Sequence, residues 1–133
     1  MNKKGVKYIS ITHKGVVKME KNVQISMLLD IYGNLLTEKQ NELLDDYYNN
    51  DLSLSEIAEN QSITRQAVRD NLKKGENKLF EYEEKLGFMK KTIMQEEQVA
   101  KILSELNKIE KNSTDKEVAK VLQDVRKKIN CLI

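Results

Sequence analysis

The chain has 133 residues, of which 33% are charged and 5% are aromatic, and it contains no proline. This length corresponds to one domain, or to one small domain with an appendage, and the composition favours helices over a sheet. No apolar run approaches the roughly 18 residues of a membrane span, and the amino-terminal segment lacks the apolar centre of a signal peptide. The single cysteine, Cys131, excludes an internal disulfide and fits a reducing compartment, so we expect a cytoplasmic protein without a membrane span.

The formal net charge of +2 is unevenly distributed along the chain. Residues 1–18 contain five lysines and no acidic residue, which leaves 18 basic and 21 acidic residues, a net charge of −3, for the rest of the chain. A negatively charged body does not bind polyanions in general, so nucleic-acid binding would require a local basic patch. Residues 1–18 also show little helical periodicity, and we expect them to be a disordered extension before an alternative start at Met19.

Two amphipathic helices are expected after this extension. Apolar residues recur at helical spacing between residues 20 and 36, and Gly33 indicates a short final turn. The sequence Thr37-Glu-Lys-Gln40 is a capping box, which predicts the start of a second helix. We expect that helix to end at turn residues 49–51 and to bury Leu43, Leu44, Tyr47 and Tyr48.

The segment SLSEIAENQSITRQAVRDNL, from Ser53 to Leu72, has the pattern of a helix-turn-helix. The sequence Ser53-Leu-Ser-Glu56 is a capping box that starts the first helix, and Thr64 caps the second helix. Ala58 is the small residue that two helices need where they cross closely. Apolar anchors lie on both sides of it: Leu54, Ile57, Ile63, Val68 and Leu72.

The second helix of this motif is expected to extend to Leu86 and to end at Gly87. Its apolar residues are spaced by three, four or seven positions, which predicts a single apolar stripe along the helix. Gly75 interrupts this stripe. It either lies at a close contact with another helix or destabilises the helix locally by about 1 kcal/mol relative to alanine.

Two further helices are predicted, over residues 91–111 and residues 114–131, and Thr114 with Glu117 forms a capping box at the start of the latter. Their apolar residues recur at heptad spacing, for about two heptads each. These helices either pack back on their own domain or form the interface of a homodimer. The predicted domains are the extension 1–18, a helix-turn-helix domain 19–90 and a C-terminal helical region 91–133 with a candidate role in dimerisation.

The sequence carries no catalytic or metal-binding pattern. The only histidine, His13, and the only cysteine, Cys131, lie more than 100 positions apart, without the spacing of metal ligands. There is also no glycine-rich phosphate loop and no nucleophile placed next to a base. We therefore expect no enzymatic activity, no metal and no cofactor.

The charges predict a nucleic-acid-binding face on the second helix of the motif. Residues 64–74 carry a net charge of +3, whereas residues 37–60 carry −6. The first turns of such a helix enter the major groove, where Gln66 can pair with adenine and Arg65 or Arg69 with guanine. The candidate nucleic-acid-binding residues are Thr64, Arg65, Gln66, Arg69, Lys73 and Lys74.

Asp70 belongs to the same outward side of that helix. Its carboxylate repels phosphates unless it accepts a hydrogen bond from cytosine or pairs with Lys73 or Lys74. Together with the acidic residues of 37–60, Asp70 leaves a second interpretation open, in which the helix docks on a basic or mixed protein partner. A third interpretation is a solvated helix face without a partner.

The segment LLTEKQNELLDDYYNNDLSLSEIAENQSITRQAVRDNLKKGENKLFEYEEKL resembles the core of the YlxM family of small bacterial helix-turn-helix proteins. Its SLSEIAE and ITRQAV parts are also similar to region four of sigma factors, which reads promoter DNA. The resemblance covers about residues 19–90. Ser62 and Thr64 stand where glycine and serine are usual, and we expect slight strain at Ser62 because serine adopts a left-handed backbone less easily than glycine.

The resemblance implies an all-α protein, with a wingless helix-turn-helix domain similar to sigma region four and additional C-terminal helices. It also implies an often dimeric protein without enzymatic activity. The family is placed in the signal recognition particle pathway, largely because its genes neighbour those of the particle's GTPases. Two functions follow: a regulator that binds DNA or RNA, and an interaction module that modulates the particle's protein or RNA without sequence-specific DNA binding.

Overall fold

The computed structural model describes residues 19–132, and within this range it contains six α-helices, one short 3₁₀ helix and no strand. These elements are α1 (Lys21–Tyr32), the 3₁₀ helix (Gly33–Leu35), α2 (Glu38–Tyr48), α3 (Leu54–Gln61), α4 (Arg65–Leu86), α5 (Phe88–Asn112) and α6 (Lys116–Asn130). The predicted all-α fold is therefore confirmed, while the predicted extension 1–18 lies outside the described residues. The chain divides into one unit that ends at Met89 and a second that begins at Lys90.

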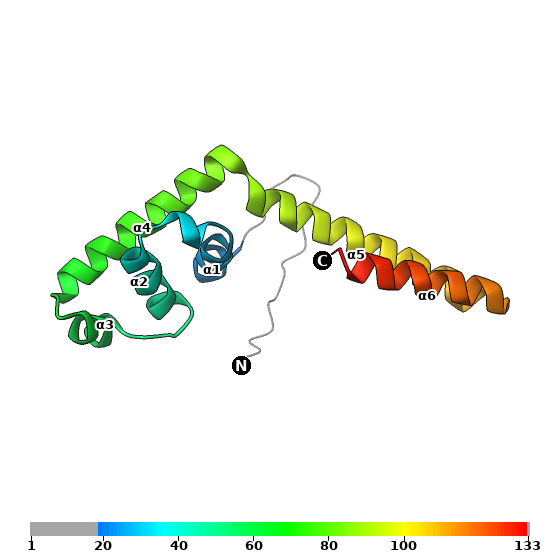
Figure 1. The fold of residues 1–133 in the computed structure, drawn as a ribbon, viewed down its shortest axis with the longest axis horizontal. Coiled ribbons are helices and arrows are strands. Elements are labelled where there is room, and N and C mark those ends of the chain that lie inside the picture. Colours follow the sequence, from blue (N-terminus) through cyan, green and yellow to red (C-terminus); the bar gives the residue numbers. More distant parts are fainter. Residues whose placement is uncertain (1–18, 133) are drawn as a thin grey trace. The chain divides into compact units, whose positions relative to one another are not determined.

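The first unit is built around α4, against which α1, α2 and α3 all pack (Figure 1). Their apolar faces enclose a core of side chains that are at most 1% exposed: Ile25, Leu28, Tyr32, Leu43, Leu44, Ile57, Val68 and Leu79. Full burial of one such aliphatic side chain contributes about 1.5–3 kcal/mol, so this core holds three short helices against the long one.

Gly75 allows α4 to lie close against α2. A Cβ atom at this position would be 2.8 Å from Cδ1 of Leu44, well inside van der Waals contact. Of the two predictions for Gly75, the close contact with another helix is therefore confirmed.

The helix ends of the helix-turn-helix follow the predicted chemistry. Ser53 and Glu56 make both bonds of a capping box: Glu56 N donates to Ser53 Oγ (3.2 Å) and Ser53 N donates to Glu56 Oε2 (2.7 Å). At the start of α4, Thr64 Oγ1 accepts a hydrogen bond from Ala67 N (3.1 Å). Gly87 ends α4 as predicted, with a positive φ of 65° that glycine adopts without strain.

Of the other two predicted capping boxes, the one at Thr37 marks the start of α2 as predicted but is incomplete, and the one at Thr114 is wrong. At α2 only one of the two bonds forms: Thr37 Oγ1 accepts from Gln40 N (3.3 Å), whereas Gln40 Oε1 has no hydrogen-bond partner among the described residues. At α6 the capping residue is Asp115, whose side chain accepts from Glu117 N (2.9 Å). Aspartate caps a helix as well as threonine does, and Asp115 rather than Thr114 directly precedes the first helical residue.

Two further details differ from the predictions. Tyr47 is 37% exposed instead of buried, and Tyr48 is half-buried. Tyr47 and Tyr48 each follow a buried leucine, Leu43 or Leu44, by four residues, so helical periodicity alone does not distinguish their exposure. In addition, α5 begins at Phe88 rather than at residue 91, because Gly87 alone separates it from α4.

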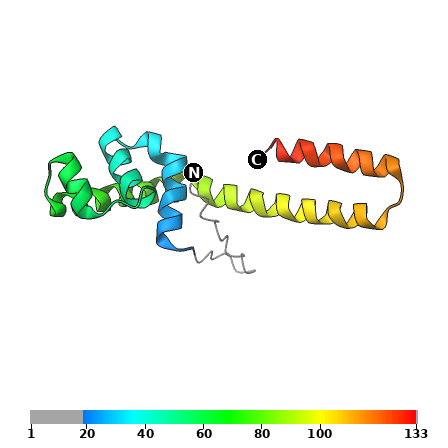
Figure 2. The same cartoon turned by 90° about the horizontal axis from the view of Figure 1, so that it is seen from below.

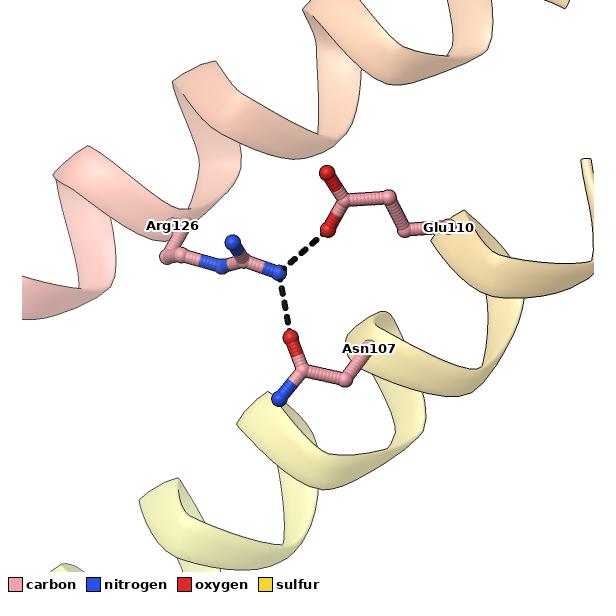
Figure 3. Close-up of polar contacts among 3 residues, drawn as sticks. All are labelled: Asn107, Glu110 and Arg126. Atoms are coloured by element: carbon pink, nitrogen blue, oxygen red, sulfur yellow. Dashed lines mark hydrogen bonds and ion pairs between the residues drawn. The ribbon is translucent and has the colours of Figure 1, made fainter. Parts of the chain in front are cut away.

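The second unit is formed by most of α5 and by α6, which run antiparallel as a helical hairpin (Figure 2). Arg126 of α6 links the two helices (Figure 3). Its Nη2 donates to Oε2 of Glu110 (2.7 Å) and to Oδ1 of Asn107, both on α5. Helix α6 therefore folds back along α5. None of the helices in the described range has the length and hydropathy needed to cross a membrane.

Candidate nucleic-acid interface

Helices α3 and α4 form a tight helix-turn-helix (Figure 1). Ala58 is 7% exposed, and its carbonyl oxygen accepts a backbone hydrogen bond from Ile63 N across the turn (3.0 Å). Ser62 has a left-handed backbone, with φ 53° and ψ 41°, at the turn position where slight strain was expected. The turn is thus closed by backbone bonds and carries its strain at a single serine.

The apolar anchors fix one side of the motif in the core. Ile57 and Val68 are completely buried, and Leu72 is 5% exposed. Leu54 and Ile63, nearer the edge, are half-buried. Because Val68 and Leu72 hold one side of α4 against the core, the opposite side of its first turns faces outward.

The six candidate residues at the start of α4 are all exposed: Thr64, Arg65, Gln66, Arg69, Lys73 and Lys74. We call the surface that they form the α4 face. Arg65, Arg69 and Lys73 follow one another at intervals of four residues, so their charges form a row along the helix. None of these three cations makes an ion pair within residues 19–132.

Asp70 is engaged by Gln66 rather than by a lysine. Its Oδ1 accepts a hydrogen bond from Gln66 Nε2, one helical turn earlier, at a distance of 3.0 Å. Of the two alternatives considered for Asp70, pairing with Lys73 or Lys74 is not made in the described part of the chain. The Gln66 amide is therefore held along the helix and must release or share this bond before it can pair with adenine.

Acidic side chains of α2 and α3 accept hydrogen bonds at the ends of those helices. Asp45 Oδ1 accepts from Asn49 Nδ2 (2.6 Å) at the end of α2, and Glu56 completes the capping box of α3. The hydrogen bond from the Ser53 backbone lowers the pKa of Glu56 below its ordinary value. Glu56 is thus ionised at neutral pH and keeps its negative charge at the start of α3.

A pocket of about 520 Å³ borders the α4 face within the first unit. Its aromatic lining is Tyr47, Tyr48 and Phe80, and its cations are Lys21, Arg69 and Lys73. Two of the candidate residues, Arg69 and Lys73, therefore also belong to this pocket, whereas the other four do not line it. Residues 19–132 contain no group of histidine, cysteine, aspartate and glutamate side chains that could hold a metal ion.

The sequence does not indicate that α1 and α2 contribute to this pocket. From sequence alone, Tyr47 belongs to the core and Lys21 has no role. The spacing gives no signal for Tyr47, because Tyr47 and Tyr48 each follow a buried leucine by four residues. No signal marks Lys21 either, since its place depends on how α1 packs against α4.

Comparison with known proteins identifies relatives across most of the chain. Residues 19–125 match the family model UPF0122, described as "Putative helix-turn-helix protein, YlxM / p13 like". A UPF0122 protein of Acetivibrio thermocellus is 44% identical over 115 residues, which cover 86% of this chain and 98% of that protein. A UPF0122 protein of Fusobacterium nucleatum is 52% identical over 80 residues, which cover 59% and 78% of the two chains. A UPF0122 protein of Clostridium kluyveri is 58% identical over 71 residues, which cover 53% and 64%.

Proposed function

This chain belongs to the YlxM / p13 like family of helix-turn-helix proteins, and on that premise we propose that it is a non-enzymatic cytoplasmic regulator that binds DNA or RNA through the α4 face. The observation that carries the proposal is the row of Arg65, Arg69 and Lys73, exposed at the start of the second helix and without ion pairs in the described range. Cations in such a position supply most of the affinity of a protein for phosphates.

The candidate residues divide into two roles in this proposal. Arg65 and Gln66 contact base edges, because arginine fits guanine and glutamine fits adenine, whereas Arg69 binds a phosphate. Lys73 and Lys74 bind phosphates, and Thr64 at the start of the helix adds a hydroxyl donor. The first group gives sequence preference, and the second gives affinity for any sequence.

Fluorescence anisotropy on labelled DNA and RNA across a salt series tests the proposal. Lys73→Ala should reduce the slope of log K against log salt by about one unit. The matched control is Lys39→Ala, which removes another exposed lysine, from α2, and should leave the slope unchanged. Weak binding of the wild type to every duplex and RNA, without salt dependence, would remove the proposal.

The base-reading role has its own test. Arg65→Ala should cost about 1–3 kcal/mol on a preferred sequence and much less on an unrelated one. Lys73→Ala should weaken both by the same factor, because a phosphate contact carries no sequence information. Equal losses for both sequences with Arg65→Ala would assign Arg65 to the phosphates instead.

An interaction module of the signal recognition particle is the second candidate function. The observations that favour it are the net charge of −6 over residues 37–60 and the carboxylate of Asp70 on the α4 face. In this case the protein binds the particle's protein or its RNA. A pull-down of the particle's protein that survives nuclease treatment would support the module, and loss of the protein on treatment would indicate RNA.

We also propose that the α5–α6 hairpin mediates homodimerisation. Apolar side chains on it stay exposed in the single chain, including Ile102 (44%), Ile109 (50%) and Val121 (62%). Light scattering should show twice the 15.5 kDa mass of the chain, and Ile109→Glu should restore the monomer. The control Lys108→Glu changes a neighbouring exposed residue and should leave the dimer intact. A mass of one chain at every concentration would contradict the proposal.

A further inference from the structure

The pocket beside the α4 face combines contributions from α1, α2, α3 and α4. Its volume of about 520 Å³ lies within the range of about 300–1,000 Å³ that is typical of pockets for small molecules. One nucleotide is a ligand of that size class. The chemistry of the lining decides which ligand fits.

Two adjacent tyrosines supply the aromatic part of the pocket. The rings of Tyr47 and Tyr48 meet edge to face, with centroids 5.0 Å apart and an interplanar angle of 85°. Tyr48 is fixed because its hydroxyl donates a hydrogen bond to Glu76 on α4. Tyr47 keeps 37% of its surface exposed. A positioned aromatic ring with exposed surface is the platform on which an unstacked nucleobase binds.

Cations outnumber carboxylates in the lining. Lys21, Arg69 and Lys73 share the pocket with one carboxylate, that of Glu76. Both oxygens of Glu76 are engaged: Oε2 pairs with Lys21 Nζ (2.7 Å), and Oε1 accepts from Tyr48. Arg69 and Lys73 have no such partner within the described residues, so their charges are available to a phosphate.

We propose that this pocket receives one unpaired nucleotide of a nucleic-acid strand, with its base stacked on Tyr47 and its phosphate bound by Arg69 and Lys73. The inference rests on the proposed function, because the strand must first lie on the α4 face. Asn77 in the lining offers an amide donor and acceptor to the edge of the base. An acidic peptide would use the cations and leave the aromatic rings without a partner.

The pocket discriminates between nucleic acids by whether they contain an unpaired base. A base that is paired and stacked within a continuous helix cannot enter the pocket, whereas a base in a bulge, a loop or a single strand can. The pocket therefore distinguishes a strand with an unpaired nucleotide from a duplex of the same sequence. The α4 face alone would make no such distinction.

The test uses the full chain and two labelled RNA hairpins that differ by one bulged adenosine. The wild type should bind the bulged hairpin about tenfold more tightly, as expected for stacking of one base. Tyr47→Leu keeps the apolar volume, removes the aromatic ring and should abolish this preference, while affinity for the paired hairpin is unchanged. The control Phe88→Leu makes the same kind of change at an exposed ring outside the pocket and should keep the preference.

Each other outcome has a defined meaning. Equal affinity of the wild type for both hairpins, or a preference that survives Tyr47→Leu, overturns the proposal that the pocket binds a nucleotide. The proposal that the α4 face binds nucleic acid is unaffected by either result. Binding of neither hairpin, with no binding to any DNA duplex, removes the proposed function and the pocket with it. Competition by free adenosine monophosphate as strong as that by the bulged strand shows a site for free nucleotides and overturns the strand-bound form.

A second measurement needs no variant. Iodouridine placed at the bulge should crosslink under ultraviolet light to Tyr47 or Phe80, as identified by mass spectrometry of the digested complex. A crosslink to a residue outside the pocket overturns the inference even if the bulged hairpin binds more tightly.

Discussion

Tyr32 and Glu83 join the first helix to the end of the fourth: Tyr32 Oη donates a hydrogen bond to Glu83 Oε2 at 2.7 Å, across 51 positions of sequence. Both partners also receive backbone donors from the start of α5. Phe88 N donates to Tyr32 Oη (3.2 Å), and Met89 N donates to Glu83 Oε2 (3.0 Å). Because Tyr32 is only 1% exposed, this network keeps a buried hydroxyl and the first amides of α5 bonded.

Removing the Tyr32 hydroxyl should destabilise the first unit. Tyr32→Phe deletes a hydrogen bond to a charged group and the acceptor of an amide, and we expect a loss of about 1.5–3 kcal/mol in the free energy of unfolding. Urea titration followed by circular dichroism measures it. The control Tyr82→Phe removes a longer bond to the Leu35 carbonyl (3.3 Å) and should cost less. Equal losses in the free energy of unfolding for both variants would show that the Tyr32 network contributes no more to stability than the single bond of Tyr82.

The same tyrosine should make stability depend on alkaline pH. Burial raises the pKa of Tyr32 above its ordinary value of 10.0, and the hydrogen bond to Glu83 raises it further. The folded state therefore favours the neutral phenol. The contribution of this neutral phenol to the free energy of unfolding is complete below about pH 10 and is lost as the pH rises through the folded-state pKa. The stability advantage of the wild type over Tyr32→Phe should be constant below about pH 10 and should shrink as the pH rises from about 10 to about 12 in urea titrations. A constant difference over this range would contradict the assignment.

Gly75 should be coupled to Leu44. Gly75→Ala brings a Cβ to 2.8 Å from Leu44 Cδ1. Overpacking of about 1–3 kcal/mol is then only partly offset by the helix propensity of alanine, about 1 kcal/mol. Leu44→Val removes Cδ1, so Gly75→Ala should be less destabilising in that background. A double-mutant cycle by chemical unfolding measures this coupling, and the same effect of Gly75→Ala in both backgrounds would exclude it.

Asp70 should restrain binding to nucleic acid. Asp70→Ala removes a carboxylate from the α4 face and releases the Gln66 amide from its 3.0 Å hydrogen bond. Affinity for DNA or RNA should rise, and the salt slope should steepen by up to about one unit. The control Asp124→Ala removes an exposed carboxylate from α6. Weaker binding with Asp70→Ala would indicate that the carboxylate itself contacts the ligand, as in a hydrogen bond from cytosine.

The sequence predicts the helix-turn-helix well because the signals for it are local. Ser53 with Glu56, Thr64 and Gly87 act on backbone groups within a few positions of themselves, so their effects can be derived without a fold. Ala58 and Gly75 are small residues inside apolar stripes, which indicates close helix contacts. The exposure of the α4 face follows from the same periodicity, although what it binds does not.

The remaining features depend on packing between distant segments. Asp115 and Thr114 are both good caps, and only the final position of α6 decides between them. Tyr47 fits an apolar stripe, but 37% of it is exposed in the folded chain. The pocket joins Lys21 of α1 with Arg69 of α4, a relation that no spacing in the sequence encodes.

Nuclear magnetic resonance of the isotope-labelled full chain, titrated with a DNA duplex and with the bulged RNA hairpin, tests the central claim most directly. If the α4 face binds nucleic acid, the largest amide shift changes should fall on residues 64–77 for at least one of the two ligands. Changes confined to the lysine-rich residues 1–18, or to α5 and α6, would contradict it.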